Sequence, residues 1–248
     1  MCIKAKLDMN HSNSEIQMPR GNWTFSGINP DLFQAHIEKS IPGYREGYRI
    51  ITSLSDYFIG ENSCVVDLGC SNGQLIRSLS NFHQDKTGLR FMGIESAQTF
   101  QAPFLETTAG LSRHHTFDFS LSRAENMELP VSDLFISYYT FQFLKPMHRQ
   151  PLINRIYNCL NWGGGFFLFE KVRGPDARFQ DMFNTSYFEY KLANNFSAEE
   201  ILDKYLSLKG VLEPYTSQAN LDFLRRAGFS DVAIIYKNIC FEGILAIK

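Results

Sequence analysis

One stretch decides the fold: Ser63-Cys64-Val65-Val66-Asp67-Leu68-Gly69-Cys70-Ser71-Asn72-Gly73-Gln74-Leu75. The β-branched Val65 and Val66 precede a polar loop, and apolar residues then recur at helical spacing, which predicts strand, tight loop and helix. Gly69 and Gly73 let the backbone pass close to a ligand, and the helix start offers free N–H groups. The G-x-x-x-G spacing lacks the extra glycine of dinucleotide folds, so it favours a nucleoside over a pyrophosphate.

A second predicted strand, Arg90-Phe91-Met92-Gly93-Ile94-Glu95, ends in a carboxylate about twenty residues further on. An acid at this place accepts hydrogen bonds from ribose hydroxyls. Asp67, at the end of the first strand, either orders the loop or accepts a hydrogen bond from a ligand ammonium. Together these residues predict a site for S-adenosylmethionine (SAM). The alternative is an ordinary strand–helix turn followed by an unrelated surface glutamate.

Composition limits the class of protein. The chain has 248 residues, 44% of them hydrophobic, and a net charge of −2, which argues against a general polyanion binder. Five cysteines without a C-x-x-C pair favour neither disulfides nor zinc and suggest the reducing cytoplasm. We find no pattern of an export signal or a membrane span. The polar residues 1–20 are predicted to form a flexible tail.

The remaining pattern is that of an α/β domain over residues 21–248. Helices are expected from Pro30, after Pro42-Gly43-Tyr44, over 152–160 with a glycine stop at 162–165, and before Gly228. Further strands are expected at 115–121, 133–139, 166–169, 231–236 and 241–247, with the last two antiparallel.

Residues 172–212 are predicted to form an inserted helical cap. Ser197 and Glu200 form a capping box, and the helix that they open has an apolar side of Ile201, Tyr205, Leu208 and Leu212. Five basic and six acidic residues are evenly mixed in this segment, so direct nucleic-acid binding is not expected. Aromatic residues ahead of the glycine loop, such as Trp23, suggest a cover over the site.

Several segments resemble one family. They are Pro42-Gly43-Tyr44, the loop from Asp67 to Gly73, Thr140-Phe141-Gln142-Phe143-Leu144, Glu170-Lys171, Ala193-Asn194 and Ile247-Lys248. From about residue 21 to the end, the chain resembles carboxy-S-adenosyl-L-methionine synthase. The resemblance implies a Rossmann-like class I methyltransferase fold, α/β, with a mostly parallel seven-stranded sheet, an antiparallel C-terminal strand and a helical cap. It also implies a homodimer that converts SAM and prephenate into a carboxylated SAM used in modifying tRNA wobble uridine.

The chain departs from this family at positions that the resemblance makes functional. Tyr205 stands where the family has the cap arginine that holds the new carboxylate, and Tyr138 replaces an asparagine at the end of the fourth strand. Asn72 replaces an arginine in the glycine loop, and Arg123 replaces the acid after the third strand. A tyrosine cannot reproduce the bidentate guanidinium clamp on a carboxylate. Arg45 or Lys191 is left as a compensating cation.

The candidate site residues form two groups. The predicted cofactor-binding residues are Asp67, Gly69, Cys70, Ser71, Gly73, Glu95, Ser96, Arg123, Ala124 and Tyr138. The predicted catalytic residues are Tyr44, Tyr138, Tyr139 and Tyr205, whose rings suit a sulfonium cation, although plain packing explains each tyrosine about equally well. His36 is kept as an acid/base candidate. No metal site is predicted, because His83, His114, His115 and His148 lack partners at ligand spacing.

Four functions remain open. The first is a SAM-dependent methyltransferase that acts on a small molecule in a closed aromatic pocket. The second is carboxy-SAM synthesis from SAM and prephenate. The third is a cyclase in which the amino group of SAM attacks its own side chain, giving a small cyclic amino acid and methylthioadenosine. The fourth is a non-catalytic SAM binder.

Overall fold

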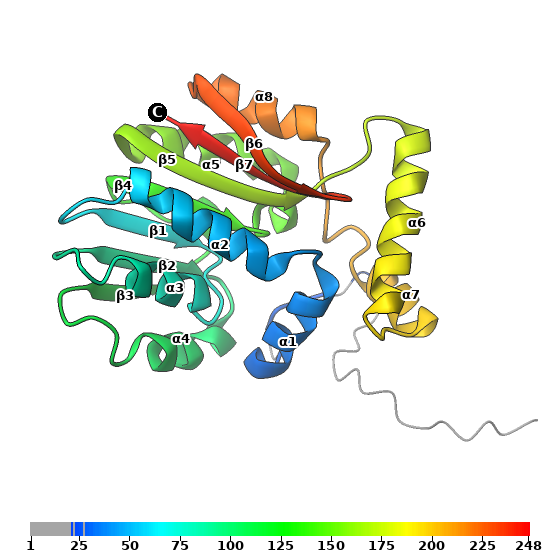
Figure 1. The fold of residues 1–248 in the computed structure, drawn as a ribbon. Helices are drawn as coiled ribbons and strands as arrows, with labels where there is room; N and C mark the ends of the chain where they lie inside the picture. The colour runs from blue at the N-terminus through cyan, green and yellow to red at the C-terminus, as the bar shows by residue number, and fades with distance from the viewer. Residues whose placement is uncertain (1–20, 22, 27) are drawn as a thin grey trace, which may run out of the picture.

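The computed structural model describes residues 21, 23–26 and 28–248, so the predicted tail 1–20 lies outside the described residues. The described chain forms a seven-stranded sheet of order β3-β2-β1-β4-β5-β7-β6, in which β7 alone runs antiparallel to both of its neighbours (Figure 1). The strands are β1 (Cys64–Leu68), β2 (Arg90–Glu95), β3 (Thr116–Leu121), β4 (Ser132–Tyr138), β5 (Leu160–Lys171), β6 (Asp231–Asn238) and β7 (Phe241–Ile247). The predicted sheet, its parallel core and its antiparallel final pair are confirmed.

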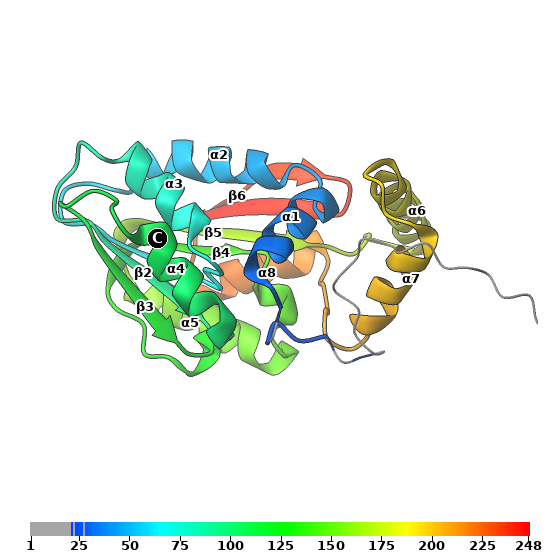
Figure 2. The ribbon, with the colours of Figure 1, turned by 90° about the horizontal axis from the view of Figure 1, so that it is seen from below.

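Helices cover both faces of the sheet. One face packs on α2 (Tyr44–Leu54), α3 (Gln74–Phe82) and α4 (Gln101–Thr108), and the other on α5 (Pro146–Cys159) and α8 (Ser217–Ala227) (Figure 2). Successive strand residues alternate between these layers: Val65 lies in one apolar cluster and Val66 in the other. Because both faces are buried, the strands read as continuous apolar runs.

The predicted strand–loop–helix at β1 is present. Gly69 has φ +81° and Gly73 has φ +80°, a conformation that favours glycine. A Cβ on Gly69 would lie 2.2 Å from Thr140 Oγ1, and one on Gly73 would lie 2.9 Å from the Phe104 ring. Both glycines are therefore required by close packing around the loop.

Two boundaries differ from the prediction. Helix α5 begins at Pro146, six residues before the expected start, because Pro146 fits the first turn, where no N–H partner is needed. The glycines at 163–165 do not stop this helix, since they lie within β5. A Cβ on Gly164 would lie 2.8 Å from the Asp133 carbonyl, so the glycine allows β4 to come close where the register shifts.

At the carboxyl ends of the strands lie α1 (Pro30–Ser40) and a helical pair, α6 (Ala177–Ala193) and α7 (Ala198–Ser207) (Figure 1). The predicted capping box of Ser197 and Glu200 opens α7. The expected apolar side of this helix is only partly correct: Ile201 is buried, but Tyr205 is 59% exposed. Within the described residues, no helix is long and apolar enough to cross a bilayer.

Candidate active site

A cavity of about 960 Å³ opens at the carboxyl ends of the strands. Its volume lies at the upper end of the usual range for ligand sites, about 300–1,000 Å³. One side, here called the sheet wall, consists of Gly69, Ser71, Glu95, Ser96, Arg123, Ala124 and Glu125. The opposite side, here called the helix wall, consists of His36 on α1 and of Tyr187, Lys191, Ile201, Lys204 and Tyr205 on the helical pair.

The Glu95 carboxylate of the sheet wall is held by backbone hydrogen bonds. Its Oε1 accepts hydrogen bonds from the backbone N–H groups of Ser96 (2.7 Å) and Ala97 (2.9 Å), and its Oε2 accepts one from Ser71 (3.2 Å). Burial raises the pKa of this carboxyl, while the backbone donors oppose that shift. The result is an oriented carboxylate with lone pairs left for ribose hydroxyls.

Three predicted cofactor residues do not line the cavity: Asp67, Cys70 and Gly73. Burial, followed by the charge of Glu95, raises the pKa of Asp67 to about 7, and its Oδ1 has no hydrogen-bond partner among the described residues. The Cys70 side chain packs beneath the loop against Gly93. These residues shape the loop from below, and their direct contact with a ligand stays a prediction.

The four predicted catalytic tyrosines all line the cavity, but only three of them lie together. The rings of Tyr44, Tyr138 and Tyr139 contact one another, with centroids 4.6 to 6.2 Å apart. The Tyr138 hydroxyl donates to the Tyr44 carbonyl, and the Tyr139 hydroxyl is buried without a partner in the described chain. Burial raises the pKa of all three phenols, so they offer neutral aromatic faces and no strong base.

Tyr205 stands apart from these rings. Its described ring contact is with Phe188 on α6, at 6.4 Å between centroids. Among the described residues the rings of Tyr205 and Tyr138 make no contact with each other, although the sequence prediction placed both at the sulfonium end. Their shared role is untested.

Cations line the cavity opposite the sheet wall. Lys171, at the end of β5, and Lys191 both place Nζ over the Tyr187 ring, 4.4 and 4.8 Å from its centroid. Lys204 Nζ lies 2.7 Å from the centroid of Trp23. In the described part of the chain, no carboxylate forms an ion pair with any of these three lysines. We call Lys171, Lys191 and Lys204 the lysine cluster.

Burial disfavours the charged forms of the lysine cluster. Burial, with a neighbouring lysine charge as the second cause, lowers the pKa of Lys191 to about 8 and that of Lys204 to about 6. The face of the Trp23 indole favours the charged form of Lys204 and opposes this shift. A ligand anion would raise these pKa values again by pairing with the protonated lysines.

His36 belongs to the same region. Burial, then the charges of Lys204 and Lys191, lower its pKa to about 4, and its Nε2 is buried without a hydrogen-bond partner in the described residues. His36 is therefore a neutral imidazole at pH 7, consistent with an acceptor or donor toward a ligand but not with a cation.

The sequence prediction named Lys191 but missed Lys171 and Lys204 as site residues. One signal for Lys204 was present: it lies three residues after Ile201 and four before Leu208, on the apolar side of α7. A lysine on an apolar helix side often reaches into a cavity or across apolar surface.

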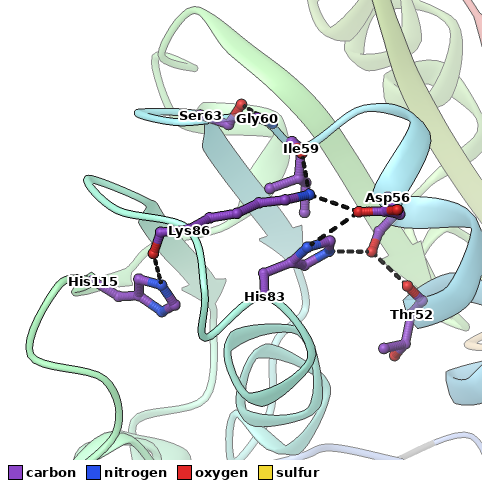
Figure 3. A network of polar contacts seen from close by, with 9 residues as sticks. Thr52, Asp56, Ile59, Gly60, Ser63, His83, Lys86 and His115 are labelled. Carbon is purple, nitrogen blue, oxygen red and sulfur yellow. Dashed lines mark hydrogen bonds and ion pairs between the residues drawn. The ribbon is translucent and has the colours of Figure 1, made fainter.

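His83 and His115 lie in a polar network near the amino ends of β1 and β2, away from the cavity (Figure 3). His83 Nε2 lies 2.8 Å from Ser55 Oγ and its Nδ1 lies 3.8 Å from Asp56, while Lys86 pairs with Asp56 at 2.6 Å. This order of serine, histidine and aspartate is not a hydrolytic site, because Ser55 is fully buried. Within the described residues, no group of His, Cys, Asp and Glu is arranged to hold a metal.

Comparison with known proteins shows the family and the fold of the chain. No family model matches the chain. The carboxy-S-adenosyl-L-methionine synthase of Staphylococcus epidermidis is 32% identical over 91% of this chain and 97% of its own length. The protein of the same name from Campylobacter jejuni is 31% identical over 94% of this chain and 97% of its own. The chain belongs to the carboxy-S-adenosyl-L-methionine synthase family.

Solved structures similar to this carboxy-S-adenosyl-L-methionine synthase family member share its fold at low identity. Human N-acetylserotonin methyltransferase, solved in complex with SAM, has a TM-score of 0.59, 18% identity, and covers 89% of this chain and 55% of its own. The cyclopropane synthase MmaA2 of Mycobacterium tuberculosis has a TM-score of 0.56, 14% identity, and covers 75% of this chain and 62% of its own. The predicted class I methyltransferase fold is confirmed, and the family supports the predicted SAM-dependent enzyme.

Proposed function

We propose that this protein is a SAM-dependent transferase that methylates a small, carboxylate-bearing acceptor. The observation that carries the proposal is one continuous cavity with acids on the sheet wall and cations on the helix wall. The sheet wall fits a nucleoside, and the lysine cluster fits an anion. Both a cofactor and a second small molecule therefore have a place.

The residues of the sheet wall fit SAM. Glu95 offers an oriented carboxylate for the ribose, and Gly69 and Ser71 of the adjacent loop line the same wall. The buried Ser71 hydroxyl has no partner among the described residues, so it is available to a ligand. SAM supplies an electrophilic methyl group, and Tyr44, Tyr138 and Tyr139 provide neutral aromatic surface at the adjoining part of the cavity.

The size of the cavity favours a two-substrate reaction over cyclisation. A cavity of about 960 Å³ is at the top of the range for ligand sites and leaves room beside one nucleoside. A cyclase that acts on SAM alone needs no such room. A non-catalytic binder likewise has no use for buried lysines beyond the nucleoside, because unpaired buried ammonium groups reduce stability.

In this proposal the chain acts mainly by orienting its ligands. The lysine cluster would hold the carboxylate of the acceptor, and the helical pair would act as a cap that excludes water from the acceptor. Methyl transfer needs the nucleophile in line at about 3–3.5 Å, and orientation of this kind supplies several kcal/mol of rate enhancement. His36, whose buried Nε2 has no hydrogen-bond partner in the described chain, is placed to exchange a hydrogen bond with the acceptor.

Carboxy-SAM synthesis is the second candidate. The absence of the family's cap arginine argues against it on sequence grounds, because an unpaired buried carboxylate costs several kcal/mol. The lysine cluster favours it, since three lysine side chains line the same cavity and a bound carboxylate would favour their protonated forms. A lysine gives a point charge and no bidentate fork, so it would hold the product carboxylate less specifically than an arginine.

Product analysis distinguishes these reactions. The purified protein is incubated with SAM alone, with SAM and prephenate, and with SAM and a panel of small hydroxy and amino acids, and the products are identified by mass spectrometry. S-adenosylhomocysteine with a methylated acid supports the proposal. Carboxy-SAM formed with prephenate, or methylthioadenosine formed from SAM alone, contradicts it and selects the second candidate or the cyclase.

The expected cellular setting is also a proposal. We infer a cytoplasmic enzyme with a small-molecule substrate and no direct contact with nucleic acid. Four cysteines of the described chain are free thiols, and the net charge of −2 gives no general attraction for phosphate backbones.

A further inference from the structure

Helix α1 presents two polar side chains to the cavity, His36 and Ser40. They are four residues apart and therefore lie on the same side of the helix, where the apolar Phe33 and Ile37 line the same cavity. His36 Nε2 and Ser40 Oγ are both buried, and neither has a hydrogen-bond partner within the described residues. Because an unpaired buried polar atom reduces stability, these two atoms point to a polar group of a ligand.

His36 lies next to the lysine cluster. Its ring packs edge-on against Phe196, with centroids 5.3 Å apart, and Lys191 Nζ lies 5.9 Å from the centroid of the same Phe196 ring. Burial, then the charges of Lys204 and Lys191, lower the pKa of His36 to about 4, so the imidazole is neutral at neutral pH. One small molecule can therefore contact the lysine cluster and a neutral imidazole at the same time.

The groups around His36 differ in the hydrogen bonds that they can make. Lysines that pair with a ligand carboxylate are protonated and only donate, and the Trp23 indole N–H, buried without a partner in the described chain, also only donates. A neutral imidazole has one nitrogen that accepts. A ligand hydroxyl in this part of the cavity needs an acceptor for its hydrogen, and His36 supplies one. A ligand ammonium would instead lie beside the like charges of the lysines.

We propose that His36 is a specificity-determining residue that selects acids carrying a hydroxyl group over unsubstituted acids and amino acids. In this arrangement the carboxylate of the ligand pairs with the lysine cluster, and its hydroxyl donates a hydrogen bond to the imidazole of His36. The inference rests on the proposed binding of an acid at the lysine cluster and names the class of that acid. It concerns binding alone, and no step of the reaction is assigned to His36.

Equilibrium binding without turnover tests this selectivity. Calorimetry at neutral pH measures the affinity of the full chain, saturated with S-adenosylhomocysteine, for benzoate, meta-hydroxybenzoate, para-hydroxybenzoate and para-(aminomethyl)benzoate. A neutral hydrogen bond predicts that the better of the two hydroxy acids binds about three- to tenfold more tightly than benzoate. The aminomethyl acid should bind more weakly than benzoate, because the lysines repel its ammonium group.

Two substitutions separate the acceptor nitrogen of His36 from its ring. His36→Phe keeps a ring against Phe196 but removes the acceptor, so the preference for the hydroxy acid should fall to within about twofold. His36→Gln restores an acceptor oxygen and should keep a larger preference than His36→Phe. His114→Phe is the matched control, because His114 is exposed and lies off the cavity wall; it should keep the wild-type preference. Benzoate, which lacks the hydroxyl, is the reference in each variant, and thermal denaturation checks that each variant is folded.

Equal binding of benzoate and both hydroxy acids by the wild-type protein, or a preference that His36→Phe leaves unchanged, would overturn the assignment of His36 and leave the acid site in place. Tighter binding of the aminomethyl acid than of the hydroxy acids would overturn it as well. Absence of binding by all of the acids would remove the acid site itself, and with it this inference. Failure of methyl transfer would leave the binding result intact, because no reaction is measured.

Discussion

The two walls of the cavity differ in how their charged groups are held. On the sheet wall, Glu95 is oriented by backbone N–H groups of its own strand end and of the adjacent loop. On the helix wall, Lys191 and Lys204 come from two different helices and have no carboxylate partner in the described chain. The carboxylate of the first wall is held by backbone donors without a ligand, whereas the protonated lysines of the second wall are unfavourable until an anion binds.

The largest effect is expected on the sheet wall. Glu95→Ala removes the acceptor for two ribose hydroxyls and leaves the Ser71, Ser96 and Ala97 N–H groups without their partner. Each charge-assisted hydrogen bond contributes about 1.5–3 kcal/mol, so SAM affinity should fall by about 100-fold or more. Calorimetry with SAM measures this loss. Glu128→Ala is the control, and equal SAM affinity in Glu95→Ala and wild type would remove Glu95 from the site.

On the helix wall we expect a smaller loss of affinity for an anion, and this loss depends on pH. Lys204 must be protonated to pair with an anion, and its pKa without ligand is lowered to about 6 by burial and the Lys191 charge. Affinity for a carboxylate probe such as prephenate, measured in the presence of S-adenosylhomocysteine, should therefore fall as the pH rises above 6, by up to about tenfold per unit for one proton taken up.

Lys204→Met should abolish this slope and weaken the probe by about tenfold at pH 6, while Lys145→Met, at an exposed position off the wall, should keep both. Stability gives an independent readout. Between pH 6 and 10.5 the unfolded chain binds a proton at Lys204 that the folded chain does not, so this lysine makes stability rise with pH. A wild-type slope in Lys204→Met would show that Lys204 is not the titrating group.

The last prediction concerns the outer side of the helical pair, where a substitution should change the mass of the assembly but not the ligand site. Phe179, Met182, Leu192 and Leu202 are each 45 to 55% exposed, an apolar surface that we propose is covered by a second copy of the chain. Light scattering should give about twice the 28.5 kDa chain mass. Met182→Glu should reduce it toward one chain, and Met147→Glu, at an exposed site on α5, should not. A wild-type mass near 28.5 kDa at micromolar concentration would contradict the dimer.

The sequence by itself determined the sheet wall. Two valines, a glycine loop and a strand ending in Glu95 predict the first βαβ unit because each signal is local, and strands buried on both faces read as apolar runs. The capping box at Ser197 was equally readable, since its two residues satisfy each other within one helical turn. A proline that begins a helix and a glycine run inside a strand were misjudged, because the same residues also end elements.

The tertiary structure alone decided the helix wall and the place of each candidate. Lys171, Lys191 and Lys204 meet over the rings of Tyr187 and Trp23, which lie far apart in the chain, and local periodicity carries no record of such a meeting. The burial of a charge, and with it the pKa, depends on what packs against it from other elements. For the same reason Asp67 lies beneath the loop and Tyr205 is exposed.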